Sequence, residues 1–285
     1  MVGENKSFDL RLRKGFQGKL CVPLVSIITV VFNGASHIRQ TILSVLQQSY
    51  KNIEYIIIDG GSTDGTLEII KEFDSLIDYW KSEPDSGISD AFNKGISFSK
   101  GDLIGIINAD DWYNPDAVEK IVEAHLLHPR DIIHGNIQFW TDQSRMIYVF
   151  YGNDSFLPYR SSINHPTVFV PRIIYNKIGL YSLKYKMAMD FEWLGRAKQN
   201  GINFYYLNTI IANMRRGGIS DQKWFRSYWE GAKARNDLKV PLLLNSWLFV
   251  KSIFLTISRK LLESLRLYRI IQFYRNRMSI GRIRY

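Results

Sequence analysis

Strand-like and helix-like segments alternate along the first half of the chain, and this order limits its possible folds more than any other feature. Continuous β-branched or apolar runs, typical of strands buried on both faces of a parallel sheet, occupy residues 25–31, 53–58 and 103–107. Predicted helices cover residues 37–48, 66–73 and 88–98. Because this order is typical of layered α/β domains, we predict an α/β, Rossmann-like fold with a mostly parallel sheet.

The alternation weakens after residue 131, where the predicted segments are more varied. We expect strands at 131–140, 146–151 and 204–207, and helices at 172–178 and 190–200. The predicted division of the chain is an N-terminal extension (1–23), a main domain (24–235) and a C-terminal helical tail (236–285).

Composition excludes several classes of protein. Of the 285 residues 46% are apolar and 22% charged, so the chain is neither disordered nor fibrous. Cys21 is the only cysteine, which excludes an internal disulfide and favours a reducing, cytoplasmic compartment. The N-terminus lacks the apolar segment of a signal peptide. The sequence has no run of about 18 uninterrupted apolar residues, so we expect no membrane-spanning helix.

The net charge of +10 is concentrated at the C-terminus. Residues 251–285 hold nine basic residues and one acid, with apolar residues between them at helical spacing. Such a basic amphipathic tail can lie on an anionic membrane surface. The alternatives are a helical pair packed on the main domain and, with less support, a nucleic-acid contact. No helix-turn-helix, RNA-binding or zinc pattern accompanies the charge, so we expect no nucleic-acid partner.

Polar clusters follow three of the predicted strands. The first strand ends in Thr29-Val-Val-Phe-Asn33, the second in Asp59-Gly-Gly-Ser-Thr-Asp64, and the third in Asn108-Ala-Asp-Asp111. Ligands of open parallel sheets bind at the carboxyl ends of the strands, so we expect these clusters to form a nucleotide pocket. Asp59 and its glycines suit either a base or ribose contact or simple turn chemistry.

Acidic pairs suggest the chemistry. Asp110 and Asp111 would repel each other unless a cation lay between them, which indicates Mg²⁺ or Mn²⁺, although a helix N-cap explains them as well. Asp190 lies in an apolar setting that would raise its pKa and suit a general base, and it could equally cap the helix that follows. His165 is either part of an active-site loop or a turn residue. The basic, glycine-containing segment 215–220 could bind phosphate or simply be a basic loop.

Taken together and in this order, these motifs resemble those of glycosyltransferase family 2. The matching segments are 25–33, 58–65, 85–95, 108–111 and 190–193. The resemblance implies a GT-A fold, a nucleotide-sugar donor, a divalent metal ion and inversion of the anomeric centre. It implies donor binding by Thr29, Val31, Asn33, Asp59, Gly61, Asp90, Asn93, Asn108 and Asp110. It further implies a metal site at Asp111 and Asp110, a catalytic base at Asp190, and acceptor or diphosphate contacts from His165, Glu192, Arg215, Gly217, Gly218 and Ser220.

Two positions depart from the usual family pattern. Asn108 stands where an aspartate is common, which lowers the charge of the metal site, and Gly60 replaces the second aspartate of the usual Asp-Asp-Gly-Ser. The Gln-x-x-Arg-Trp motif of processive synthases is absent. The resemblance therefore implies transfer of one hexosyl or N-acetylhexosaminyl unit per acceptor. Together with the basic, aromatic tail, it leads us to expect a lipid-linked or polysaccharide acceptor and a peripheral enzyme on the inner face of the membrane. The alternatives are a sugar nucleotidyltransferase, whose N-terminal glycine- and arginine-rich loop is missing, and a non-catalytic scaffold.

Overall fold

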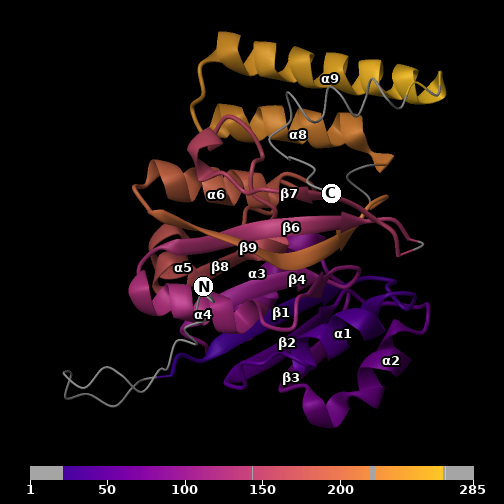
Figure 1. Cartoon of the computed structure of the whole chain (residues 1–285), viewed down its shortest axis with the longest axis vertical. Coiled ribbons are helices and arrows are strands. Elements are labelled where there is room, and N and C mark those ends of the chain that lie inside the picture. The colour runs from indigo at the N-terminus through magenta and orange to yellow at the C-terminus, as the bar shows by residue number, and fades with distance from the viewer. Residues whose placement is uncertain (1–21, 143, 219–221, 266, 268–285) are drawn as a thin grey trace, which may run out of the picture.

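The sheet at the centre of the molecule is built around four parallel strands. The computed structural model describes residues 22–142, 144–218, 222–265 and 267, and its nine-stranded sheet has the order β3-β2-β1-β4-β8-β6-β9-β5, with β7 beside β6 (Figure 1). The parallel strands are β1 (Val25–Val31), β2 (Ile53–Asp59), β3 (Tyr79–Ser82) and β4 (Leu103–Asn108). The others are β5 (Trp112–Tyr113), β6 (Ile132–Trp140), β7 (Met146–Phe150), β8 (Val168–Pro171) and β9 (Phe204–Arg215).

Helices cover both faces of the sheet, which confirms the predicted α/β class. Every residue of β1 is buried, and alternate side chains of a strand point to opposite faces. Ile28 and Val30 belong to one hydrophobic cluster, whereas Ile27 and Val31 belong to the other. The helices of the first cluster are α3 (Ile88–Phe98), α5 (Arg172–Ile178) and α6 (Met189–Gln199). The helices of the second are α1 (Ile38–Leu46), α2 (Thr66–Glu72) and α4 (Ala117–Leu127).

Strand β9 is much longer than the predicted segment 204–207. It pairs in parallel with β6 over its whole length, and the pairing register shifts between His134 and Asn136. Gly135 lies at this bulge, where a Cβ atom would be 2.8 Å from the carbonyl oxygen of Thr209. The polar residues Asn208 and Thr209, which ended the predicted strand, therefore fall in a bulge inside a continuing strand. Through the added length, β9 reaches β5 at the edge of the sheet.

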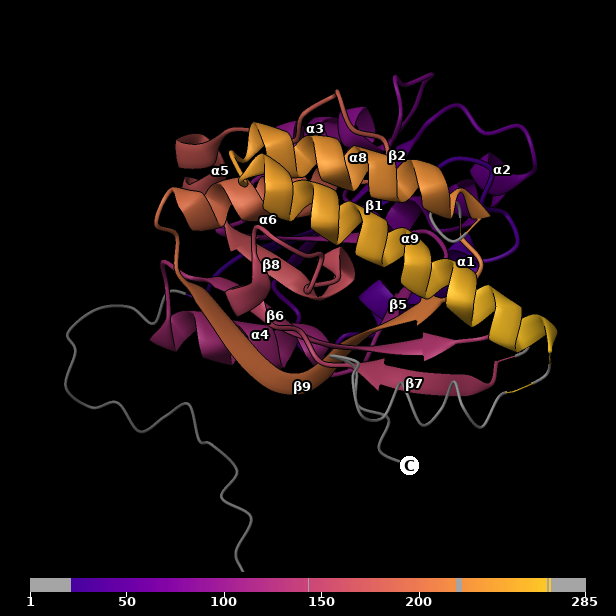
Figure 2. The ribbon, with the colours of Figure 1, turned by 90° about the horizontal axis from the view of Figure 1, so that it is seen from above.

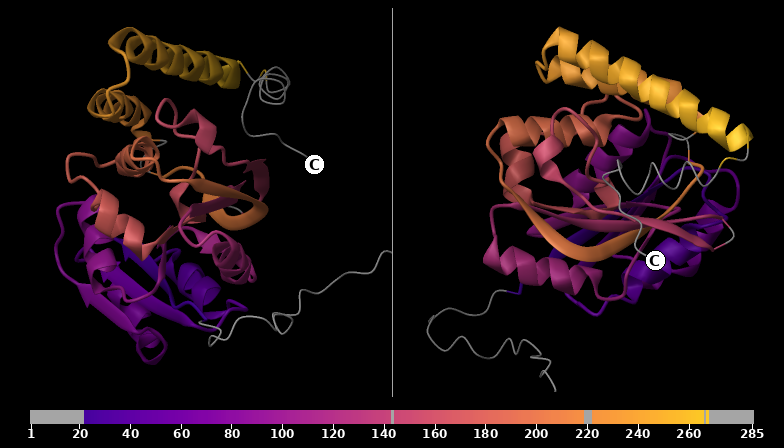
Figure 3. Two further views of the ribbon diagram at one scale, coloured as in Figure 1. Left: turned by 90° about the vertical axis from the view of Figure 1, so that its left-hand side faces the viewer. Right: turned by 45° about the horizontal axis from the view of Figure 1, so that its top comes forward.

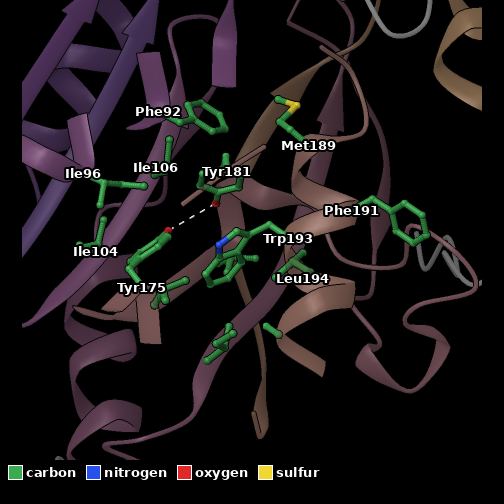
Figure 4. Close-up of a cluster of buried hydrophobic side chains, with 14 of the residues drawn as sticks. Phe92, Ile96, Ile104, Ile106, Tyr175, Tyr181, Met189, Phe191, Trp193 and Leu194 are labelled. Atoms are coloured by element: carbon green, nitrogen blue, oxygen red, sulfur yellow. Dashed lines mark hydrogen bonds between the residues drawn. The ribbon is translucent and has the colours of Figure 1, made fainter. Parts of the chain in front are cut away.

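An aromatic cluster fixes the helix that carries Asp190. Trp193 of α6 is fully buried, and its indole N–H donates to the carbonyl of Gly179 at 2.8 Å. The rings of Tyr175 and Tyr181 lie 4.8 and 5.5 Å from the Trp193 ring, and their hydroxyls are 3.5 Å apart (Figure 4). This packing holds the first turn of α6 in place.

Two helices stack outside α6 at the C-terminal end of the described chain. They are α8 (Trp224–Asp237) and α9 (Leu242–Ser264), and both views of Figure 3 show α9 as the outermost layer. The predicted boundary between residues 235 and 236 falls inside α8, which packs against α6. The basic residues from Arg266 onward, on which the predicted tail partly rests, lie outside the described residues.

Candidate active site at the strand ends

The register of the parallel strands brings the predicted polar clusters to one edge. Val31 of β1 is paired with Asp59 of β2, and Val30 is paired with Asn108 of β4. The loops that follow β1, β2 and β4 therefore start side by side, as the sequence predicted. The three loops nevertheless differ in how their polar groups are used.

Around the ends of β1 and β2, the polar side chains bind one another. The carboxylate of Asp59 is buried and accepts hydrogen bonds from the backbone and hydroxyl of Ser62 and from the hydroxyl of Ser82. Asn33, at a positive φ of 52°, receives a bond on its side chain from the Thr63 N–H and donates its own N–H to Ser62 at 2.7 Å. These bonds make a braced turn, which is the turn chemistry considered for Asp59.

Thr29 and Val31 do not reach the surface of this edge. The Thr29 hydroxyl is buried and lies 3.0 Å from the Tyr55 hydroxyl, which is itself buried. Val31 packs in the same hydrophobic cluster, beneath the helices α1 and α4. We therefore leave the side chains of both residues out of the candidate site.

A hollow of about 550 Å³ opens beside this braced turn. It is lined by Phe32, Gly60, Gly61, Pro84, Asp85, Ser86, Gly87 and Lys186. The Phe32 ring is 66% exposed, and a Cβ atom at Gly60 would approach an Asp85 carboxylate oxygen to 2.7 Å. Gly61, one of the predicted donor contacts, belongs to this lining, whereas sequence reasoning missed Phe32 and Lys186. An exposed aromatic ring directly after a buried strand was the signal available for Phe32.

The two predicted donor contacts on α3, Asp90 and Asn93, form hydrogen bonds to neighbouring loops. Asn93 receives the backbone N–H of Tyr181 on its amide oxygen and donates its amide N–H to the Tyr181 carbonyl, both at 2.9 Å. Asp90 accepts the Ser86 N–H and pairs with Lys94 at 3.3 Å. Asp90 therefore braces Ser86, which lines the hollow, whereas Asn93 fixes the loop at Tyr181, away from the lining.

At the end of β4, by contrast, buried oxygens have no partner. Asn108 Oδ1 and both carboxylate oxygens of Asp111 are buried without a hydrogen bond among the described residues. Burial, and then the charge of neighbouring Asp110, raise the pKa of Asp111 well above its ordinary value. The backbone N–H and charge of Arg215 and the Asn108 side chain oppose this rise, but none of them makes a hydrogen bond of good geometry to the carboxylate. Burial raises the pKa of half-buried Asp110 too, while the charges of His37 and Arg215 act against this rise.

These oxygens fit a hard divalent cation. Mg²⁺ and Mn²⁺ bind carboxylate and amide oxygens, commonly one or two from the protein together with phosphate oxygens of a substrate. Among residues 22–142, 144–218, 222–265 and 267, no group of three or more His, Cys, Asp or Glu side chains forms a ready-made cage. A site of one or two carboxylates completed by a substrate agrees with both observations.

The basic residue at the end of β9 lies against this acidic loop. Because Trp112 of β5 pairs with Asn213 of β9, the neighbouring Arg215 reaches over the Trp112 ring, 4.7 Å from its centre. Arg215 also donates to the side chain of Gln40 on α1. Gly217 and Gly218 follow it, Gly217 with a φ of +98°, and Ser220 lies outside the described residues.

Asp190 and His165 meet on the same edge of the sheet. Strand β8 runs antiparallel to β4, with Phe169 beside Gly105, so the short helix His165–Thr167 before β8 lies next to the end of β4. His165 Nδ1 is 3.9 Å from Asp190 Oδ2, and Asp190 is the second residue of α6. Burial raises the pKa of Asp190 to about 6 and lowers that of His165 to about 4. At neutral pH the imidazole is therefore uncharged beside an ionised carboxylate.

Glu192 has a structural partner. It is buried and pairs with Arg196, one turn later on α6, at 2.9 Å. Arg196 also donates to the carbonyls of Ile178 and Leu180 at the end of α5. Glu192 therefore helps to fasten α6 to α5.

A carboxylate on α8, which the sequence did not indicate, supports the candidate site from outside. Glu230 is buried, and its Oε2 accepts the backbone N–H groups of Lys186 and Met187, each at 2.8 Å. Asp237, about two helical turns further along α8, accepts the Tyr185 hydroxyl at 2.6 Å. Because Lys186 lines the hollow, Glu230 of α8 supports one wall of the site from behind.

The family model described as glycosyl transferase family 2 matches residues 26–187. The chain belongs to this family. An uncharacterized glycosyltransferase of Rickettsia typhi is 32% identical over 197 residues, which are 64% of this chain and 61% of that protein. The chain thus matches less than two thirds of the length of this family 2 relative.

Solved structures of glycosyltransferases share the fold and confirm the GT-A expectation. Staphylococcus aureus TarS 1–349 in complex with UDP-GlcNAc has a TM-score of 0.59 and 16% identity, covering 80% of this chain and 71% of that one. The mannosyltransferase PcManGT of Pyrobaculum calidifontis, in complex with GDP-Man and Mn²⁺, has a TM-score of 0.58 and 13% identity, covering 90% and 82%. The hollow, the unpaired oxygens and Asp190 of this family 2 chain all lie at the strand ends of this fold.

Proposed function

We propose that this chain transfers a single sugar from a nucleotide-sugar donor to an acceptor hydroxyl, in a reaction that depends on a divalent metal ion and inverts the anomeric centre. One observation carries the proposal: buried, unpaired oxygens of Asn108 and Asp111 share a sheet edge with Asp190, an acid whose pKa is raised by burial. Acids kept in unfavourable surroundings are common at functional sites.

The hollow beside Phe32 is the proposed site of the nucleotide. The exposed Phe32 ring offers a flat apolar surface for a base, and Gly60 and Gly61 let the backbone approach a ligand closely. Lys186, also in the lining, supplies a positive charge suited to phosphate. Asp59 would act here by bracing the turn that carries the two glycines.

Asp111, with Asn108 and Asp110, would hold the Mg²⁺ or Mn²⁺ ion. The fit rests on the three unpaired oxygens and on their hard-ligand chemistry. When bound, such an ion offsets the charge of a leaving diphosphate as a Lewis acid.

Asp190 would be the general base. Its carboxylate takes the proton of the acceptor hydroxyl, whose oxygen forms a bond to the anomeric carbon while the bond from that carbon to the diphosphate oxygen breaks. A single displacement of this kind inverts the anomeric centre. The nearby His165 is neutral, so it does not lower the pKa of Asp190 by a positive charge.

The acceptor we propose is lipid-linked or a polysaccharide, and the donor sugar a hexose or N-acetylhexosamine. The basic C-terminal sequence supports work at the inner face of the cell membrane, where such acceptors would be presented.

The test is a panel of nucleotide sugars incubated with the full-length protein, with and without Mn²⁺. We expect slow metal-dependent hydrolysis of one donor to free sugar and nucleoside diphosphate, and a rise in melting temperature when donor and Mn²⁺ are added together. Asp111→Asn should lose both effects, while Asp116→Asn, an exposed acid paired with Lys120, should keep them. In a parallel assay with a nucleoside triphosphate and a sugar 1-phosphate, release of pyrophosphate would instead indicate a nucleotidyltransferase. Absence of donor binding would indicate a scaffold.

A further inference from the structure

The side of α9 that faces α8 carries buried polar residues together with Phe249, whose ring lies 6.2 Å from that of Phe225 and 6.0 Å from that of Trp229 on α8. On this side Asn245, Ser252 and Thr256 follow one another at intervals of seven and four residues, which places them on one face of the helix. Asn245 is buried and bonds with Arg235 Nε, with the Asn236 side chain and with the Ala232 carbonyl. Thr256 is also buried and lies 2.7 Å from the Tyr228 hydroxyl. Polar contacts near both ends therefore fasten α9 along α8.

The opposite side of α9 is a broad apolar surface, which we call the outer face. Its central stripe repeats every three or four residues over the whole helix and consists of Leu243, Trp247, Val250, Phe254, Ile257 and Leu261. All six are exposed, Leu243 by 87%. Leu244 and Leu255 widen the face beyond this stripe. Figure 2 shows α9 lying across the outside of the molecule. A helix on the surface of a soluble protein normally packs its apolar stripe against the core and turns polar residues to solvent.

Lysines stand at the borders of this face, each beside a tryptophan. Lys251 Nζ lies 4.5 Å from the Trp247 ring centre, and Lys260 Nζ lies 4.8 Å from that of Trp224. Helical spacing places Lys251 and Lys260 on opposite flanks of the outer face. Lysines that reach sideways over amphipathic rings are typical of helices at a membrane surface. The sequence that follows is strongly basic, which complements an anionic surface.

We propose that α9 lies flat in an anionic lipid leaflet, with its outer face at the boundary between headgroups and acyl chains. By length and composition alone α9 could cross a membrane. A crossing would require α9 to leave α8 and expose Asn245, Arg235 and Thr256, whereas the flat orientation keeps these bonds. A coiled-coil contact with a second copy needs only a narrow apolar seam. The outer face is wider than such a seam and carries Trp and Phe. The purpose of docking rests on the proposed function, but the docking itself does not.

The experiment measures binding of the full chain, without substrates, to vesicles of phosphatidylcholine with or without phosphatidylglycerol. The variant replaces Leu243, Val250 and Phe254 by Gln. The matched control replaces Leu126 and Leu127 by Gln, exposed apolar residues on α4. We expect binding to the anionic vesicles to fall at least about tenfold in the α9 variant and to stay unchanged in the control. Metal-dependent donor hydrolysis in solution should persist in both variants, so loss of docking is distinguishable from failure of the proposed function.

Depth measurements distinguish the flat orientation from a crossing. In a Cys21→Ser background, which removes the only cysteine, a fluorophore is attached after Leu243→Cys, Val250→Cys or Leu261→Cys. Quenching by lipids brominated near the headgroup should be strong and equal at all three positions. Strong quenching of the Val250 site alone by deeply brominated lipids would indicate a crossing and overturn the proposal. Unchanged vesicle binding of the α9 variant would overturn it too, as would a dimer that the variant abolishes in the absence of lipid.

Discussion

Two neighbouring strand ends of the sheet treat their carboxylates in opposite ways. At the end of β2, Asp59 is buried but accepts three hydrogen bonds from Ser62 and Ser82. At the end of β4, Asp111 is equally buried and neither of its oxygens has a hydrogen bond among the described residues. A buried acceptor with partners stabilises the fold, whereas one without partners costs free energy until a ligand supplies them. Burial alone therefore does not distinguish the two acids, whereas the hydrogen bonds of their oxygens do.

The largest effect we expect is at Asp190, whose pKa is raised by burial although its Oδ1 accepts the Phe191 N–H at 2.7 Å. Asp190→Asn should lower sugar transfer by about 10²–10⁴-fold, because the amide cannot take the acceptor proton. Donor binding, followed by calorimetry, should be unchanged. Glu192→Gln on the same helix serves as a control for general disturbance of α6. Transfer within a few-fold of the wild type would remove Asp190 from the role of base.

Replacing the aspartate by asparagine should destabilise the protein at the end of β2 but not at the end of β4. Asp59→Asn should lower the free energy of unfolding by about 1–3 kcal/mol, since the amide nitrogen cannot accept the serine bonds. Asp111→Asn should leave the metal-free protein as stable as before or more stable, because it removes an unpaired buried carboxylate. Urea unfolding without metal measures both. Equal losses at the two positions would show that the contrast has no energetic meaning.

The pH dependence of stability should report the raised pKa of Asp190. A carboxyl group with a folded pKa of about 6 and an ordinary value of 3.8 binds more protons folded than unfolded between these values. Its contribution to stability is therefore fully present below pH 4 and is lost as pH rises through 6. Because one fifth of the side chain is exposed, we expect a loss of about 1–2 kcal/mol relative to Asp190→Asn. Thermal unfolding of both proteins from pH 4 to 8 measures it; parallel curves would contradict it.

The catalytic rate should depend on the same group. Below pH 6, kcat/KM for transfer should fall about tenfold per pH unit, and it should level off above pH 7. The fall should persist in His165→Gln, because the imidazole is already neutral in this range. A fall that disappears in this variant would assign the titration to His165.

The smallest effect should come from Glu230, which positions the loop at Lys186 and Met187 through hydrogen bonds to its backbone. Glu230→Ala should raise the donor KM by about tenfold and change kcat little, because the Lys186 and Met187 N–H groups lose their acceptor. Glu230→Gln should restore most of the affinity. Glu263→Ala on α9 is the control. A change in kcat alone would contradict the positioning role.

The sequence predicted most of the parallel half of the fold because β1, β2 and β4 are largely apolar runs, whereas the short strand β3 is half-buried and carries Lys81 and Ser82. Residues 25–31 correspond to β1 in full, and the polar clusters were placed correctly at one edge. The longer β9 could not be predicted, since a bulge at Gly135 depends on pairing with a distant strand.

Within the candidate site, residue type predicted the acids but not their partners. Nothing in the order of residues distinguishes Asn93, whose amide is fully used by Tyr181, from Asn108, whose oxygen is unpaired. Glu230 lies about 40 residues from the loop that it holds, and no local pattern marks such a contact. The roles of the individual donor contacts, of Asp190 and of the metal site stay predictions.

The contact of Glu230 with Lys186 and Met187 has a practical consequence for shortened versions of the chain. A protein ending before Trp224 would lose α8 along with α9 and leave the backbone N–H groups of Lys186, which lines the hollow, and of Met187 without their acceptor. One ending after Lys239 would keep them covered. Inactivity of the form that ends before Trp224 would then come from the unsupported loop at Lys186 and Met187. Only the form that ends after Lys239 separates the proposed catalysis from attachment to lipid.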